Sequence, residues 1–342
     1  MKVQSSHDCK GILMPTVKSS FLIIALFALI TSCKKEIAPS EEALAATEES
    51  ASALSAMSAS NAVAAGTDWG ALIADGEIPD KMNVMDMLGV GTVRYAIVLE
   101  SHISEDKGYE RWRDAGYKIL CNLNWGHVTN NKGNKKPVPF PTDLKEYRIE
   151  LTAILDKYHP EVAVIENEET TDVFHSGPIE DYIEELKVAV EVCKARGIKV
   201  ADGGLNLELC QQVMNGTGRG TNYEETKKLI EAFKTIDLDF VNIHTKAPFS
   251  NQRNGNIFQP GAAESVADFL RQETGKQVMC NEYNNENTST SLISSATQAF
   301  ENGGYKYFVP RSDNSGNGSY PLANTTGTKL TSLGVSYKEA IK

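Results

Sequence analysis

Short apolar runs and amphipathic stretches alternate along the chain from about residue 61 onward. The runs are rich in β-branched and aromatic residues, which is typical of buried strands, and the stretches between them repeat apolar residues every three or four positions, as helices do. Strands are predicted at 92–98, 118–123, 162–165, 199–201, 240–243, 277–280 and 305–309, with an eighth expected at 61–65. This alternation predicts a parallel sheet covered by helices.

Each helical stretch carries one apolar face. The stretches lie at 144–158, 179–193, 229–236, 266–270 and 292–300. Pro178 precedes the second stretch and Gly197 follows it, as expected at the two ends of a helix. Residues 61–342 have the usual size of an eight-stranded α/β barrel. We therefore expect one compact domain with the (β/α)8 TIM-barrel fold, whose longer loops lie near 126–141, 207–222 and 247–262.

The first sixty residues read as a targeting segment and a tether. Lysines precede the apolar stretch 21–30, which is too short for a comfortable membrane span and suits a signal peptide. Residues 29–33 resemble the lipobox of bacterial lipoproteins, which implies that 1–32 are a signal peptide and that Cys33 is lipidated. The alternative is an ordinary cleavable signal with an incidental cysteine. Residues 33–60 are rich in Ala, Ser and Glu and are expected to be a flexible, membrane-anchored tether.

Composition and residue spacing limit the classes of partner and cofactor that the protein is expected to bind. The chain has 34 Lys and Arg against 45 Asp and Glu, a net charge of −11, which argues against nucleic-acid binding. No Cys-x-x-Cys or His-x-x-x-His spacing occurs, so a structural zinc site is not expected. No cofactor and no other metal are predicted. We expect a monomer held at the cell envelope, on its periplasmic or cell-surface face.

Two apolar runs each end in an Asn-Glu step. Asn167 and Glu168 follow the run at 162–165, and Asn281 and Glu282 follow the run at 277–280. In a barrel, the ends of parallel strands open on one face, where active sites lie. Two carboxylates offered there are what glycoside hydrolysis needs, because one donates a proton and the other attacks or stabilises the sugar cation. Glu166 and Glu169 flank Glu168 and remain alternatives for the acid; Glu168 is preferred because Asn167 precedes it.

The arrangement resembles glycoside hydrolase clan A, whose fourth strand ends in Asn-Glu and whose seventh ends in a nucleophilic Glu. If 61–65 is counted as the first strand, Glu168 ends the fourth and Glu282 the seventh. The resemblance implies that Glu168 is the acid/base, that Glu282 forms a covalent glycosyl-enzyme, and that Asn167 holds the sugar 2-hydroxyl. It also implies a retaining reaction with carboxyl groups ~5–5.5 Å apart, Glu168 having a raised pKa and Glu282 staying ionised.

Further substrate-binding candidates follow other strands. In the clan an arginine at the place of Arg94 often steadies the nucleophile, and a His or Tyr commonly lies at the place of His244. Arg94 is as compatible with a structural ion pair. Trp125 is equally suited to stacking on a sugar ring or to covering the barrel rim. Weaker candidates are Asn124, His127, Tyr283 and Arg311.

These residues predict a retaining glycoside hydrolase that cleaves a β-linked oligo- or polysaccharide at the cell envelope. The alternative is a non-catalytic glycan-binding barrel lipoprotein, which is favoured by one departure from the clan: residues 308–313 lack the tryptophan that many members carry after the eighth strand. A metal-dependent or serine-based mechanism has little support, because no Gly-x-Ser-x-Gly motif occurs. The sugar, its linkage, and endo or exo action stay open.

Overall fold

The computed structural model describes residues 66–74, 76–99, 106–126, 129–131, 134–247, 261–285, 288–313 and 320–342. The expected signal peptide, the tether with Cys33, the expected strand at 61–65 and His127 lie outside the described residues. Among the described residues, no helix is both long enough and apolar enough to cross a membrane.

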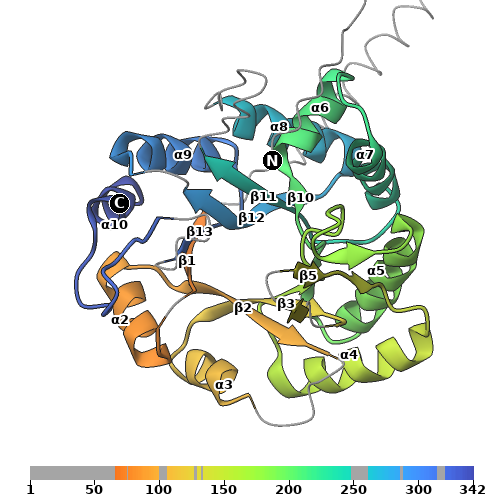
Figure 1. Cartoon of the computed structure of the whole chain (residues 1–342), viewed down its shortest axis with the longest axis horizontal. Helices are drawn as coiled ribbons and strands as arrows, with labels where there is room; N and C mark the ends of the chain where they lie inside the picture. Colours follow the sequence, from red (N-terminus) through yellow and green to blue (C-terminus); the bar gives the residue numbers. More distant parts are fainter. Residues whose placement is uncertain are drawn as a thin grey trace, which may run out of the picture. The chain divides into compact units, whose positions relative to one another are not determined.

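Parallel strands form a closed barrel in the described part of the chain, and helices surround it (Figure 1). Neighbouring strands pair in chain order, and the pairings of β13 with β1 and of β9 with β11 complete the ring. The eight barrel strands are β1 (Asp68–Ile73), β2 (Thr92–Val98), β3 (Lys118–Asn124), β7 (Val162–Ile165), β9 (Lys199–Ala201), β11 (Phe240–Ala247), β12 (Gln277–Asn285) and β13 (Tyr307–Ser312). The fold is the expected (β/α)8 barrel.

The described helices are α2 (Ile78–Leu88), α3 (Lys107–Asp114), α4 (Leu144–Tyr158), α5 (Ile179–Lys194), α6 (Leu207–Asn215), α7 (Thr221–Phe233), α8 (Gly261–Thr274), α9 (Thr290–Asn302) and α10 (Ser332–Ala340). Five further short strands in the described part of the chain lie outside the set of eight barrel strands. They are β10 (Leu205–Asn206), which extends the sheet beside β11, the antiparallel pair β4 (Thr129–Asn131) and β5 (Asn134–Lys136), and the parallel pair β6 (Val138–Pro139) and β8 (His175–Ser176).

Local chemistry explains why these segments fold as they do. In α4, the Asp143 side chain accepts hydrogen bonds from the backbone N–H groups of Lys145 and Glu146 and so caps the helix. The apolar stripe predicted from the sequence is buried in this helix. Along the strands, alternate side chains point into the barrel or towards the helices. The interior is filled by Leu120, Val162, Val164, Ala201, Phe240, Met279, Tyr307 and Val309.

Three predictions of elements need correction. The first strand is β1, at Asp68–Ile73, and not at 61–65. The strands β11 and β12 continue several residues past their predicted ends. The region 207–222, expected to be a loop, contains α6 and the start of α7. With β1 as the first barrel strand, β7 is still the fourth and β12 the seventh, so the expected positions of the two glutamates are unchanged.

Candidate active site

A bulge in β12 turns two consecutive polar residues into the barrel. Asn242 pairs with Met279 and His244 with Glu282, so two steps along β11 face three along β12. Bulges of this kind re-aim side chains beside active sites. Asn281 bonds to Asn242 within the barrel, and Glu282 beside it contacts Arg94.

The same bulge excludes Tyr283 from the site. Its ring packs against Phe300 and Phe308 on the helix side of the sheet and is fully buried. The structure therefore does not bring Tyr283 to the place predicted for a substrate-binding residue, because side chains alternate along a strand.

The loop after β7 presents Asn167 and Glu168 in a strained backbone. Glu166 has φ 66° and Glu168 has φ 50°. This left-handed conformation costs a residue with a Cβ about 1–2 kcal/mol, and such strain persists where surrounding contacts impose it. Those contacts include a 2.9 Å bond from the Asn122 amide to the Glu166 carbonyl and a 2.9 Å bond between His175 Nε2 and the Asn167 carbonyl.

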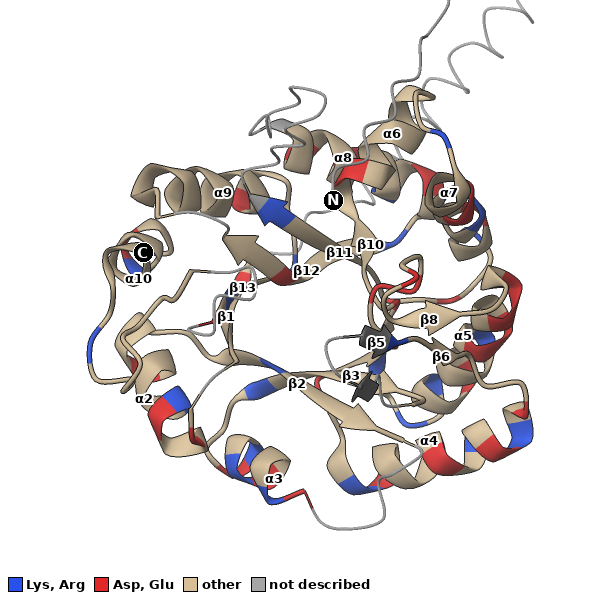
Figure 2. Ribbon diagram, in the orientation of Figure 1, with Lys and Arg blue, Asp and Glu red and all other residues tan. Residues whose placement is uncertain are grey.

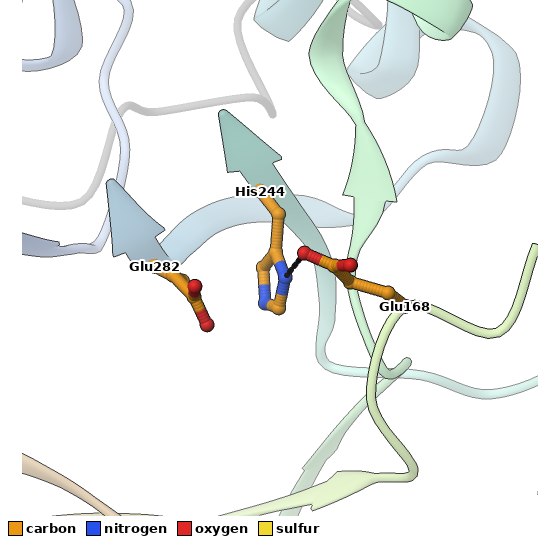
Figure 3. Close-up of side chains that lie close together, drawn as sticks. All are labelled: Glu168, His244 and Glu282. Atoms are coloured by element: carbon orange, nitrogen blue, oxygen red, sulfur yellow. Dashed lines mark hydrogen bonds and ion pairs between the residues drawn. The ribbon is translucent and has the colours of Figure 1, made fainter. Parts of the chain in front are cut away.

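Glu168, His244 and Glu282 converge at the C-terminal end of the barrel (Figure 3). Each offers an oxygen or nitrogen atom that lies within 4.8 Å of the atoms offered by the other two. One carboxylate oxygen of Glu168 thus lies within 4.8 Å of one of Glu282, which fits the ~5–5.5 Å between the carboxyl groups of retaining glycosidases better than the ~9 Å of inverting ones. The paired carboxyl groups are thus close enough to act on opposite sides of one bond.

Cationic and polar donors surround Glu282. Arg94 Nη1 contacts one carboxylate oxygen, and Asn284 donates to the other at 2.9 Å, with Arg311 Nη1 at 3.4 Å from it. Burial acts to raise the pKa of Glu282, but Arg94, followed by His244, Asn284 and Arg311, holds it well below its usual range. The carboxylate is therefore ionised at neutral pH, as its expected role requires.

Arg94 links this carboxylate to the loop after β7. Its Nη2 donates to Asn167 Oδ1, and its Nε donates to Asn122 Oδ1 at 2.9 Å. The sequence left open whether Arg94 makes a structural ion pair or belongs to the site. The ion pair that it makes is with Glu282 itself.

His244 and Glu168 are joined by a hydrogen bond of 3.2 Å between Nδ1 and Oε1. On the other side of the ring, Nε2 lies 2.7 Å from Asn281 Oδ1, an acceptor because Asn281 Nδ2 donates to Asn122. With this amide orientation, Nε2 carries a hydrogen. The Nδ1–Oε1 contact then needs one proton, either on the carboxyl of Glu168 or on the imidazole.

This contact overturns one electrostatic expectation. Burial acts to raise the pKa of Glu168, but the hydrogen bond and charge of His244 more than offset it, so the pKa lies below its usual value. The expected raised pKa is wrong for the free protein. The hydrogen bond to His244 therefore favours the ionised form of the Glu168 carboxyl.

The flanking acids have other hydrogen-bond partners and surroundings than Glu168. Glu166 Oε1 accepts a 2.6 Å bond from the Trp125 backbone, and burial raises the pKa of Glu166 to about 7. Glu169 is buried, and burial together with the charge of Asp202 raises the pKa of Glu169 well above its usual value. Of the acids after β7, Glu168 is the one that His244 joins to the site of Glu282.

Two cavities meet at Glu282. The larger, of about 560 Å³, is lined by Arg94, Asn122, Asn124, Asn167, Glu282 and Arg311, among others. The smaller, of about 330 Å³, is lined by Glu168, His244, Lys246, Glu282, Asn284 and Arg311, among others. Asn167 thus faces the larger cavity and Glu168 the smaller, with the Glu282 carboxylate between them.

Trp125 is not brought to either cavity. Its ring lies edge-on to Tyr147 at a centroid distance of 6.0 Å, and it packs against the hydrophobic core. Of its two predicted roles, the packing one agrees with this placement. Asn124, two residues along β3 from Asn122, does line the larger cavity, as a substrate-binding residue would.

The group of Glu168, His244 and Glu282 also has spacing compatible with a metal ion. However, two guanidinium groups already face the Glu282 carboxylate. A divalent cation at this place would be repelled by both of them. The charges fit a carboxylate pair working on a neutral substrate better than they fit a metal site.

Sequence reasoning missed the asparagine network under the site. Asn281 donates to Asn122 and accepts from Asn242, so the network ties three barrel strands together beneath His244. The available signal was periodicity. Asn122 and Asn242 lie an even number of positions from the interior residues Leu120 and Phe240, and polar residues at interior positions of buried strands are rarely accidental.

We expect Gly204→Ala to disturb this site. Gly204 has φ 121°, and a Cβ there would lie 2.5 Å from the His244 ring. Gly216→Ala is the matched control, since Gly216 has φ 64° with open space around it. The control should lower the free energy of unfolding by about 1 kcal/mol, and Gly204→Ala by a further ~1–3 kcal/mol from the clash. Urea denaturation measures both, and equal losses would contradict the close packing of His244.

Solved structures with this fold were found by comparison. A β-glycosidase is 13% identical with a TM-score of 0.55, the match covering 77% of this chain and 85% of that chain. A GH30 endoxylanase from Clostridium papyrosolvens is 13% identical with a TM-score of 0.51, covering 80% and 70%. A family 5 xyloglucanase from Paenibacillus pabuli is 12% identical with a TM-score of 0.51, covering 82% and 98%. The chain has the fold of known glycosidases.

No family model matches the sequence, and no curated protein sequence matches it. The likeness is therefore one of architecture at about one identical residue in eight. What the barrel does must be argued from its own side chains.

Proposed function

We propose that this protein is a retaining glycoside hydrolase that cleaves a β-linked glycan by double displacement. The observation that carries the proposal is the proximity of Glu282, paired with Arg94, to Glu168, which is hydrogen-bonded to His244. The glycosidase fold of its structural neighbours supports the same reading.

In the first step, the sugar to be transferred occupies the larger cavity, where Asn167 is placed to hold its 2-hydroxyl. Glu282 attacks the anomeric carbon, and Glu168 gives its proton to the glycosidic oxygen as that bond breaks. The leaving group departs through the smaller cavity, which Glu168 lines. The products are a glycosyl ester on Glu282 and a free hydroxyl on the leaving sugar.

In the second step, the roles of Glu168 reverse. The negative charge of Glu282 acts to raise the pKa of Glu168, and this charge disappears once Glu282 is esterified. The pKa of Glu168 then falls further, which favours the carboxylate form. Glu168 removes a proton from water as the water attacks the anomeric carbon, and Glu282 is released as the carboxylate. The configuration of the sugar is retained.

The pH dependence should report the cations around Glu282. Since Glu282 attacks only when ionised, activity is lost as pH falls through its pKa. Arg94→Gln removes the largest lowering influence on that pKa, so the acidic limb of kcat/KM should move to higher pH. Arg311→Gln should move it less, because Arg311 is the weaker influence. A pH–rate profile of the two variants measures this, and an unmoved limb in Arg94→Gln would contradict the role of Glu282.

We also propose that the enzyme works at the bacterial cell envelope, tethered through a lipid on Cys33. The support is the apolar stretch 21–30, the lipobox-like residues 29–33 and the tether to residue 60. Metabolic labelling with a palmitate analogue, compared between the parent and Cys33→Ser, tests the anchor. Equal labelling of the two would refute it.

The test of activity is a panel of β-glucans, xylans, mannans and galactans. Release of reducing ends by the purified parent, absent in Glu282→Gln, would establish the activity and its substrate class. Glycan binding without cleavage by either form would instead support the alternative, a non-catalytic glycan-binding barrel.

A further inference from the structure

The smaller cavity is lined by a lysine, Lys246, which lies two residues after His244 on β11. His244 and Lys246 are two residues apart on β11, so they lie on the same face, about 6.6 Å apart along the strand. In the register of β11 and β12, His244 lies opposite Glu282 and Lys246 lies opposite Asn284. Lys246 is the last residue but one of β11, whose tip is blue in Figure 2. It therefore lies further towards the mouth of the barrel than the reacting groups.

The other charged groups near this lysine are paired with one another. Arg94 faces Glu282, Arg311 lies between Glu282 and Asp313, and Glu168 faces His244. The Lys246 side chain makes no ion pair or hydrogen bond with another described residue, although Lys246 lines the cavity that Glu168 also lines. Its side chain is exposed.

The rest of that lining is uncharged. It combines the polar residues Thr170, Thr171, Asn206 and Asn284 with the apolar residues Val173 and Phe174. These groups suit the hydroxyls of a sugar. One unmatched cation among them favours a sugar that also carries a negative charge.

We propose that the smaller cavity is the leaving-group subsite of the enzyme and takes a sugar unit bearing an anion, bound by Lys246. The anion is a carboxylate, as in a uronic acid, or a sulfate ester. This inference rests on the proposed function, because the side of the leaving group is given by Glu168, the proposed acid, which lines the smaller cavity. Lys246 acts on specificity and takes no part in bond cleavage.

A matched pair of substrates tests the subsite. The probes are the β-glucosides, β-xylosides, β-mannosides and β-galactosides of 3-hydroxybenzoic acid and of 3-hydroxybenzamide, which differ by the charge of one group on the leaving side. With the parent, kcat/KM for the benzoate should exceed that for the benzamide by about twofold to fivefold, a range typical of an exposed ion pair. Added salt should shrink this ratio.

The variants separate charge from shape. Lys246→Gln should bring the ratio to about one or below, and Lys246→Arg should preserve it, since the charge stays. Lys227→Gln, at an exposed position on α7, is the control for the same change of net charge and should leave the ratio as in the parent. Replacing the benzoate by phenyl sulfate as the charged group then distinguishes a site that prefers carboxylate from one that prefers sulfate.

Other outcomes overturn the inference. A ratio near one in the parent, a ratio unchanged in Lys246→Gln, or an equal loss on both substrates would each show that Lys246 does not select an anion. In each of these cases the protein still cleaves the glycosides, so the proposed function is not contradicted. If neither the parent nor Lys246→Arg cleaves any of the glycosides or the panel of glycans, the proposed function fails and this inference fails with it.

Discussion

Glu282→Gln is expected to lower kcat by about 10⁴-fold or more, because an amide cannot attack the anomeric carbon and the covalent step is lost. Glutamine is the sharper choice than alanine. It keeps an acceptor for Arg94, whereas alanine would leave a buried guanidinium without its partner, at a cost of about 3–5 kcal/mol. The measurement is kcat on the glycan that the panel identifies, with thermal unfolding of each variant in parallel.

The control for this variant is Glu191→Gln, which removes one carboxylate from the exposed side of α5. It should keep the activity of the parent. If Glu282→Gln were folded and retained more than a few per cent of kcat, Glu282 would not be the nucleophile, and the reaction would have to proceed through another group.

Glu168→Gln should have an effect that depends on the leaving group. For a natural glycan, kcat/KM should fall by about 10²- to 10⁴-fold, the usual contribution of a general acid. For a 2,4-dinitrophenyl glycoside, whose leaving group departs without a proton, kcat/KM should change by less than about tenfold. Comparing the two substrates isolates proton donation from binding.

Glu166→Gln is the matched comparison, because burial raises the pKa of Glu166 to about 7 and it lines the larger cavity. It should lower both values of kcat/KM by a similar, smaller factor through disturbance of the loop after β7. The reverse result, with leaving-group dependence in Glu166→Gln and none in Glu168→Gln, would transfer the acid role to Glu166.

Much of the barrel could be predicted because buried parallel strands are apolar throughout. The run at Val162–Ile165 is such a case, and its predicted bounds are those of β7. The first strand was misplaced because Asp68–Ile73 contains a glycine and begins with an aspartate, so its apolar signal is weak. Gly70 is required there, since a Cβ would lie 2.5 Å from the Thr92 carbonyl oxygen.

The sequence predicts those site residues whose place in the site depends only on their position along a strand. Arg94 and His244 reach the expected glutamates because inward-facing residues at the same end of a closed barrel converge across its interior. The bulge at Glu282 depends on pairing between two strands, which one sequence does not contain. The lowered pKa of Glu168 likewise follows from the distance between Glu168 and His244, residues that are far apart in the chain. The same holds for Tyr283, whose direction is set by the bulge.

Trapping the glycosyl-enzyme tests the central proposal most directly. A 2-deoxy-2-fluoro glycosyl fluoride of the cleaved sugar slows both steps by withdrawing electrons from the developing cation, and its good leaving group lets the intermediate form faster than it is hydrolysed. Our account predicts inactivation with one sugar bound per chain, located by peptide mass spectrometry on Glu282. An active enzyme that forms no adduct, or one on another residue, would contradict the assignment of Glu282 as nucleophile.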